Sequence, residues 1–117
     1  MNNTLLQIQT LNKISALGLK RFPSEHYNVG DDVANPDAIL VRSQVMHDME
    51  ILASVKAIAR AGAGTNNVPI QEMSARGVPV FNAPGANANA VKELVITGML
   101  LASRNIVPAL RFTDELS

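Results

Sequence analysis

Two kinds of segment alternate along the chain, and this alternation constrains the fold more than any other feature of the sequence. Short apolar runs typical of strands occur at residues 5–8, 27–29, 38–41, 55–60 and 78–81. Patterns typical of short helices or turns lie between them, and the connections are only a few residues long. Strands and helices that alternate in this way form a parallel sheet with helices on both faces. The sequence therefore predicts an α/β fold, a flavodoxin-like doubly wound parallel sheet of about five strands.

Two of the strands can be assigned a place in this sheet. The run Ala38–Val41 is apolar at every position, which is typical of a strand buried on both faces and predicts a central place. The run Val78–Phe81 contains Pro79, which has no N–H for the ladder of hydrogen bonds and so favours an edge.

Three short helices are predicted between the strands. Asn12 is a plausible N-cap for the first helix, and Ser43 can cap a second helix whose apolar residues recur from Val45 to Leu52. The third helix is predicted over Pro69–Arg76, because proline suits a first helical position and Gly77 can end the helix in a left-handed conformation.

A longer helix is predicted from Ala88 to about Arg104, and it is apolar on most of its circumference. A small sheet cannot cover such a helix on all sides, so we expect it to leave the sheet domain and to pack on another domain or subunit. The predicted division is a domain over residues 1–87 and a crossing helix with the start of a further domain over residues 88–117. Homo-oligomer formation through the helix of residues 88–104 follows as an expectation.

Composition excludes several classes of function. Ten Lys plus Arg balance ten Asp plus Glu, which leaves no charge to attract nucleic acid or an anionic membrane. The most apolar stretch, Leu94–Ala102, is far shorter than the roughly 20 residues of a membrane span. The chain has no Cys and no secretory signal at its start, which predicts a cytoplasmic location and no thiolate metal site.

The glycine turn Gly62-Ala63-Gly64 follows a predicted strand, where a phosphate-binding loop of a dinucleotide site would lie. Such a site needs a third small residue where this chain has Asn67, and a helix that opens directly from the turn, which Pro69 delays. It also needs an acidic residue about 20 positions further on, and none occurs there. A dinucleotide loop, a purely structural turn and a small-anion site remain as interpretations, and the sequence favours the last.

Three segments are predicted to meet at one edge of the sheet. Arg42-Ser43, the turn Arg60–Asn67 and the loop Asn82–Asn87 all follow strands, and ligands of open α/β sheets bind outside the carboxyl ends of the strands. Glycines let backbone N–H groups approach a carboxylate, and an Arg adds a bidentate donor. These segments together predict an anion pocket.

Four blocks of residues resemble a known family, the D-isomer-specific 2-hydroxyacid dehydrogenases, in both order and spacing. The blocks are Ile39–Ser43, Ala59–Val68, Gly77–Asn87 and Val91–Leu94, and the likeness covers the chain from about Ile39 to Ile106. The resemblance implies the substrate-binding part of an NAD-dependent enzyme, with a flavodoxin-like fold and a long helix that crosses to the nucleotide-binding domain and supports dimerisation.

The resemblance also implies particular site residues. It assigns the acid substrate to Arg42, Ser43, Arg60, Ala61, Gly62, Gly64 and Asn87, with the backbone of residues 61–64 holding the substrate carboxylate. Ala63 occupies the position that reaches the nicotinamide of NAD, and relatives often carry Thr there.

The catalytic Arg, Glu and His of that family, and its glycine fingerprint, match nothing in this chain, so no catalytic residue is predicted and the chain is expected to be inactive alone. His26, His47 and Glu93 are interpreted as ordinary surface or interface residues, and the methionines as core residues rather than metal ligands.

The alternative to a dehydrogenase portion is a stand-alone flavodoxin-like binding or regulatory module that uses the apolar helix as a protein-interaction surface. A regulator of that kind would want an acidic cluster at the strand ends. No such cluster appears, and the pair Asp31-Asp32 lies in a predicted turn.

Overall fold

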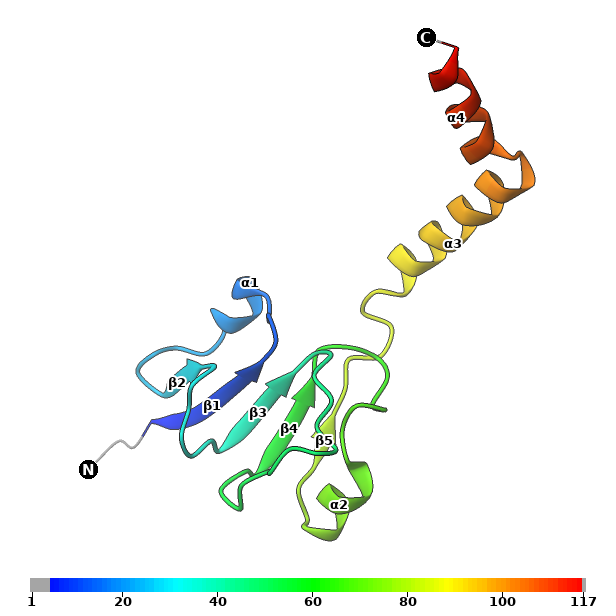
Figure 1. The fold of residues 1–117 in the computed structure, drawn as a ribbon. Coiled ribbons are helices and arrows are strands. Elements are labelled where there is room, and N and C mark those ends of the chain that lie inside the picture. The colour runs from blue at the N-terminus through cyan, green and yellow to red at the C-terminus, as the bar shows by residue number, and fades with distance from the viewer. Residues whose placement is uncertain (1–4, 117) are drawn as a thin grey trace. The chain divides into compact units, whose positions relative to one another are not determined.

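The structure, a computed structural model, describes residues 5–116 (Figure 1). The chain forms two compact units, one that ends at Pro84 and one that begins at Gly85. The first unit contains the strands β1 (Leu6–Leu11), β2 (Tyr27–Gly30), β3 (Ala38–Val41), β4 (Ala57–Arg60) and β5 (Val80–Phe81), with the helices α1 (Ala16–Leu19) and α2 (Ile70–Ala75). The second contains the helices α3 (Ala88–Ser103) and α4 (Ile106–Glu115).

The five strands form one parallel sheet in the order β2-β1-β3-β4-β5. This is the strand order of the flavodoxin-like fold, so the predicted fold class is confirmed. β3 is the central strand and β5 is an edge strand, as predicted. The arrowheads of β1, β3 and β4 point to the same side of the unit in Figure 1, which is where the loops after these strands emerge.

The hydrophobic core lies against one face of the sheet. Because side chains alternate along a strand, Ile39 and Val41 of β3 point to the same face as Ile58 of β4, and all three are buried. The side chains that cover them come from the segments on either side of β4, and they are Met46, Ile51, Val55, Val68, Met73 and Val78. This packing fixes which residues of β3 and β4 are held inside.

The opposite face of the sheet is less covered. Ala38 and Leu40 of β3 and Ala57 and Ala59 of β4 are half-buried, and Phe81, which pairs with Ala59, is 58% exposed. The prediction that β3 is buried on both faces therefore holds for only one face within residues 5–116.

The helix predicted over Val45–Leu52 is wrong, because this segment is irregular. The N–H of Met46 donates to the carbonyl of Asn67 at 2.8 Å instead of joining a helix, and only a single turn follows, closed by Met49 N–H and Met46 O at 3.2 Å. Met46 and Ile51 are nevertheless buried, so the apolar spacing marked core residues and not a helix. Tertiary contacts have overridden the local pattern.

The N-cap predicted at Asn12 is also wrong. The residue before α1 is Ser15, and Asn12 lies at the end of β1 in a left-handed conformation with φ of 67°.

The end of α2 follows the prediction. Gly77 has a φ of +69°, its N–H donates to the carbonyl of Ser74 at 3.1 Å, and the N–H of Val78 donates to Met73 O at 2.8 Å. This is the left-handed C-cap that the sequence indicated, and it turns the chain directly into the segment that leads to β5.

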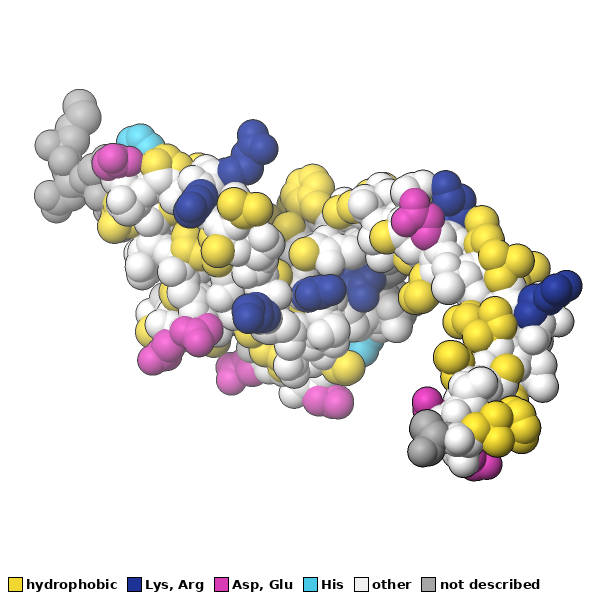
Figure 2. All heavy atoms as spheres, turned by 90° about the horizontal axis from the view of Figure 1, so that it is seen from above, with side chains coloured by type: hydrophobic (Ala, Val, Ile, Leu, Met, Phe, Trp, Pro, Cys, Tyr) yellow, Lys and Arg dark blue, Asp and Glu magenta, His cyan; other side chains and the backbone are white. Residues whose placement is uncertain are grey.

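The second unit consists of exposed apolar helices. α3 was predicted almost to the residue, whereas α4 was not predicted; it follows Asn105, whose φ of 52° breaks the path of α3. Figure 2 shows hydrophobic side chains spread over these helices, and no residue of α3 or α4 is buried within residues 5–116. The large exposed side chains of α3 are Val91, Leu94, Val95, Ile96, Met99, Leu100 and Leu101.

Within residues 5–116, no single helix has the length and apolarity to cross a membrane. By length and composition alone, α3 and α4 would pass that test together, as a pair bent by 60°.

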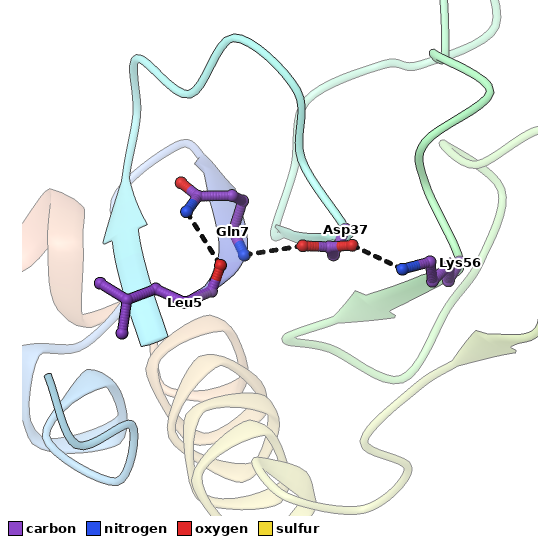
Figure 3. A network of polar contacts seen from close by, with 4 residues as sticks. All are labelled: Leu5, Gln7, Asp37 and Lys56. Atoms are coloured by element: carbon purple, nitrogen blue, oxygen red, sulfur yellow. Dashed lines mark hydrogen bonds and ion pairs between the residues drawn. The ribbon is translucent and has the colours of Figure 1, made fainter. Parts of the chain in front are cut away.

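Asp37 ties three strands together at their amino ends (Figure 3). Its carboxylate accepts the N–H of Gln7 from β1 at 2.9 Å and the ammonium of Lys56, just before β4, at 2.7 Å. Its backbone N–H donates to Gln7 O at 2.7 Å, and its carbonyl accepts Lys56 N–H at 2.8 Å. The Gln7 N–H, with the Lys56 ammonium, lowers the pKa of the Asp37 carboxyl.

We predict that Asp37→Ala lowers the stability of the sheet unit by about 1 kcal/mol at neutral pH. Because the pKa of Asp37 is depressed in the folded state, its contribution is complete above the unfolded-state value of about 3.9 and is lost as pH falls through the folded-state value. Urea unfolding followed by the fluorescence of Tyr27, the single tyrosine, at neutral and acid pH measures this.

Lys56→Ala is the control, and we expect a smaller loss because the Lys56 side chain is 73% exposed. A loss from Asp37→Ala that stayed the same at acid and neutral pH would contradict the role assigned to the carboxylate.

Candidate functional site

The parallel register brings three strand ends to the same level at the carboxyl edge of the sheet. Leu11 of β1 pairs with Val41 of β3, and Val41 pairs with Arg60 of β4. The segments that begin at Asn12, Arg42 and Ala61 therefore leave the sheet side by side. The predicted meeting of the β3 and β4 loops at one edge is thus observed.

The glycine turn after β4 leaves backbone donors uncommitted. The N–H of Ala61 donates to Val41 O at 2.8 Å, and that of Gly62 to Arg60 O at 2.9 Å. The next two N–H groups, of Ala63 and Gly64, have no hydrogen-bond partner within residues 5–116, and both residues are exposed. Successive exposed N–H groups in a turn can bind an anion. Of the backbone positions assigned to the substrate carboxylate, Ala63 and Gly64 offer free donors, while those of Ala61 and Gly62 hold the turn.

Arg60 folds back onto the turn that follows it. Its Nε donates to the carbonyl of Arg42 at 2.9 Å, and its Nη1 donates to the carbonyl of Gly64. A Cβ at Gly64 would stand 2.9 Å from Nη1 of Arg60, closer than real Cβ contacts, whereas one at Gly62 would stand 3.4 Å from the guanidinium. Gly64 thus makes room for the guanidinium, and this accounts for one glycine of the turn without reference to a ligand.

Arg42 and Ser43 lie opposite the turn, in the loop that follows β3, and both are exposed. The carbonyl of Arg42 receives the guanidinium of Arg60, but no hydrogen bond or ion pair engages the Arg42 side chain within residues 5–116. Figure 2, which views the molecule from above the strand ends of Figure 1, shows basic side chains gathered near the middle of this face, with the acidic side chains of the sheet unit towards its margin.

The segment after β5 closes the other side of the glycine turn. The side-chain amide of Asn82 donates to Ala63 O at 2.7 Å, and the N–H of Ala83 donates to Gly62 O at 3.0 Å. The exposed glycine turn thus lies beside the start of the Asn82–Asn87 loop.

Asn87 belongs to the second unit, where it stands at the N-cap of α3 and its carbonyl accepts Val91 N–H at 3.0 Å. Its assignment to the substrate stays a prediction.

Neither histidine joins the glycine turn itself. His47 is exposed, its Nε2 lies 2.8 Å from Asn66 O, and with Glu72 and the start of α2 it lines an open hollow of about 360 Å³. His26 is exposed and packs edge-on against Tyr27. Among the residues that the structure describes, no three acids or histidines come together as metal ligands.

The geometry argues against a dinucleotide phosphate on this turn. α2 begins at Ile70, well after Gly64, so no helix N-terminus opens from the turn. Asn67 is 5% exposed and points its amide at the carbonyls of Arg42 and Gln44. The small-anion interpretation of the turn stays a prediction.

Three asparagines of this edge were missed by sequence reasoning. Asn12, Asn67 and Asn82 hold the loops together through side-chain hydrogen bonds to backbone groups. The available signal was their position, directly after a strand or turn, where Asn often bonds to nearby backbone and tolerates a left-handed conformation.

A five-stranded parallel sheet in this strand order, with an exposed glycine turn at its carboxyl edge, defines a flavodoxin-like domain. Residues 7–115 match the profile of the D-isomer specific 2-hydroxyacid dehydrogenase catalytic domain, so the chain belongs to this family.

Three relatives with named activities are similar to part of this chain. The chain is 44% identical over 80 residues to the D-3-phosphoglycerate dehydrogenase of Mycobacterium leprae, which covers 66% of this chain and 15% of that protein. It is 40% identical over 87 residues to the enzyme of the same name from Archaeoglobus fulgidus, covering 72% of this chain and 16% of that protein. It is 38% identical over 76 residues to the hydroxypyruvate reductase of Thermotoga maritima, covering 62% and 25%. The aligned part of the chain thus spans between 15% and 25% of the length of these three relatives.

We predict that Gly64→Ala destabilises the sheet unit by about 1 kcal/mol, because the new methyl displaces the Arg60 guanidinium and breaks its hydrogen bonds. Gly62→Ala is the matched control and should be close to neutral, since its Cβ meets Arg60 only at van der Waals distance. Urea unfolding of both variants, repeated with Arg60→Met, measures the coupling. Equal losses for the two glycine variants would contradict the seating of Arg60 by Gly64.

Proposed function

We propose that this chain is the substrate-binding portion of an NAD-dependent D-3-phosphoglycerate dehydrogenase, located in the cytoplasm, and that it binds the acid substrate at the carboxyl edge of its sheet. The observation that carries the proposal is the pair of exposed N–H groups at Ala63 and Gly64, which have no hydrogen-bond partner within residues 5–116. The Arg42 side chain, in the neighbouring loop after β3, also has no partner among these residues. Two backbone donors suit one carboxylate, and a guanidinium suits a second anionic group.

The choice of substrate rests on charge. Both groups of relatives are named for small acids, and 3-phosphoglycerate carries a phosphate in addition to its carboxylate. Arg42 offers a bidentate donor for such a phosphate, and the Ser43 hydroxyl can add a further donor. Arg60 supports the site mainly through the turn, since two of its donors are engaged by carbonyls of Arg42 and Gly64.

NAD would accept the hydride, and Ala63 is the residue of this chain that would contact the cofactor. The alanine is exposed in the glycine turn, so its methyl group can lie against a nicotinamide ring, and it has no side-chain donor to bind the carboxamide. Oxidation of the substrate also needs a base for the hydroxyl proton close to the reacting carbon. No residue here is assigned that role, so we propose that the chain alone does not catalyse the reaction.

We predict that Arg42→Gln weakens binding of D-3-phosphoglycerate to the chain about tenfold, as expected for loss of a charge-assisted hydrogen bond. The control is Lys56→Gln, which removes the same charge at the amino edge of the sheet and should leave affinity nearly unchanged. Ligand-observed phosphorus NMR measures both. Equal weakening would point to general charge and not to a site, and NADH formation by the unmodified chain with NAD would contradict its assigned inactivity.

We further propose that α3 mediates self-association, because a large apolar surface rarely stays in contact with water. Leu94→Glu should lower the association constant at least tenfold, since the Leu94 side chain is 74% exposed and a buried unpaired charge is costly. Ser103→Glu places the same charge at a polar position of the same helix and should change it little. Sedimentation velocity gives the comparison, and a strictly monomeric chain at high concentration would refute this part of the proposal.

A further inference from the structure

The three residues after β3 are held from both sides by asparagine side chains. Asn12 Oδ1 accepts the N–H groups of Ser43 at 2.9 Å and Gln44 at 2.5 Å. On the other side, Asn67 Nδ2 donates to Gln44 O at 2.8 Å and, more weakly, to Arg42 O at 3.4 Å. Four backbone polar groups of one short segment are thus bonded to two side chains.

The backbone of Asn12 is shaped for this contact. Its φ of 67° is uncommon outside glycine, and asparagine adopts it more readily than most residues. This conformation ends β1 and leaves the carboxamide of Asn12 facing the β3 loop, where one oxygen bridges two successive N–H groups.

Asn67 provides the opposing anchor. It is 5% exposed, and its own carbonyl accepts the N–H of Met46 at 2.8 Å. Its Oδ1 makes no hydrogen bond within residues 5–116, so the buried amide is held through its donors alone. Burial of an amide is costly unless its hydrogen bonds compensate, which identifies the donors to Gln44 and Arg42 as the useful part of this side chain.

We infer that Asn12 is a positioning residue of the substrate site, acting through the backbone of Ser43 and Gln44 against the fixed anchor of Asn67. This inference rests on the proposed function for its ligand. Because the N–H groups of Ser43 and Gln44 are occupied, these two residues offer a ligand no backbone donor. The groups of this loop that we assign to the ligand are the Arg42 guanidinium and the Ser43 hydroxyl.

The physical consequence is preorganisation. A loop that must be ordered by its ligand lowers affinity by the cost of that ordering, and a loop already fixed by Asn12 avoids this cost. Asn12 therefore strengthens binding without touching the ligand.

Asn12→Gly and Asn12→Asp separate the backbone of Asn12 from its side chain. Glycine adopts φ of 67° without strain but has no acceptor, whereas aspartate keeps an acceptor oxygen in the same place. With Asn12→Gly, amide exchange at Ser43 and Gln44 should speed up about tenfold or more, and the Kd for D-3-phosphoglycerate should rise about three- to tenfold. Asn12→Asp should restore slow exchange.

Asn105→Gly is the matched control. It makes the same substitution at the other left-handed asparagine, which carries no capping hydrogen bond from its side chain, and should leave exchange at Ser43 and Gln44 and the affinity unchanged. Unchanged exchange in the β3 amides would show that the sheet remains intact.

The assignment is overturned if Asn12→Gly leaves exchange at Ser43 and Gln44 slow, or if Asn12→Asp exchanges as fast as Asn12→Gly. It is equally overturned if exchange speeds up while the affinity stays the same. If the unmodified chain fails to bind D-3-phosphoglycerate, the proposed function fails and Asn12 positions no substrate, whatever the exchange rates show.

Discussion

The parallel pairing of β1, β3 and β4 is the constraint on which the site depends. In this register the three strands end at the same level, at Leu11, Val41 and Arg60. The chain therefore leaves the sheet three times within a small area. The amide N–H groups and carbonyls at these exits have no further strand to pair with, and they must find other partners or meet solvent. The arrangement of polar groups at this edge follows from how that requirement is met.

Side chains form hydrogen bonds with several of these backbone groups. Arg60 and Asn67 donate to carbonyls of the β3 loop, and Asn82 donates to a carbonyl of the glycine turn. Asn12 accepts hydrogen bonds from N–H groups of the β3 loop. The groups left without partners in residues 5–116 include the N–H groups of Ala63 and Gly64 and the side chain of Arg42. These groups are hydrogen-bond donors, which is the chemistry that the proposed anion site needs.

The sequence predicted the sheet well because its strands are short apolar runs separated by turn residues. Ala38–Val41 could be placed at the centre and Val78–Phe81 at the edge from the chemistry of their residues alone, and Gly77 was correctly assigned as a left-handed cap. The helix predicted over Val45–Leu52 was wrong for a physical reason. Its apolar spacing suits a helix, but the Met46 N–H donates to the carbonyl of Asn67, which lies far along the chain.

Hydrogen bonds between distant loops were also beyond prediction. Arg60 was expected to meet a ligand, and a sequence cannot show that two of its donors bend back to Arg42 and Gly64. α4 escaped notice because the break that precedes it depends on the conformation of a single residue, Asn105. The strand-end segments themselves were predicted from the order of strands and turns. The family resemblance then assigned roles to their residues, and the family match over residues 7–115 supports that resemblance.

The central claim is that the carboxyl edge of this sheet receives a small acid through Ala63, Gly64 and Arg42. The most direct test is a titration of the isotope-labelled chain with D-3-phosphoglycerate, followed residue by residue through its amide NMR signals. We predict saturable shifts that are largest at Ala63 and Gly64, with a smaller set in the β3 loop and almost none at Gln7 or Lys56. Shifts spread evenly over both edges of the sheet, or confined to its amino edge, would contradict the account.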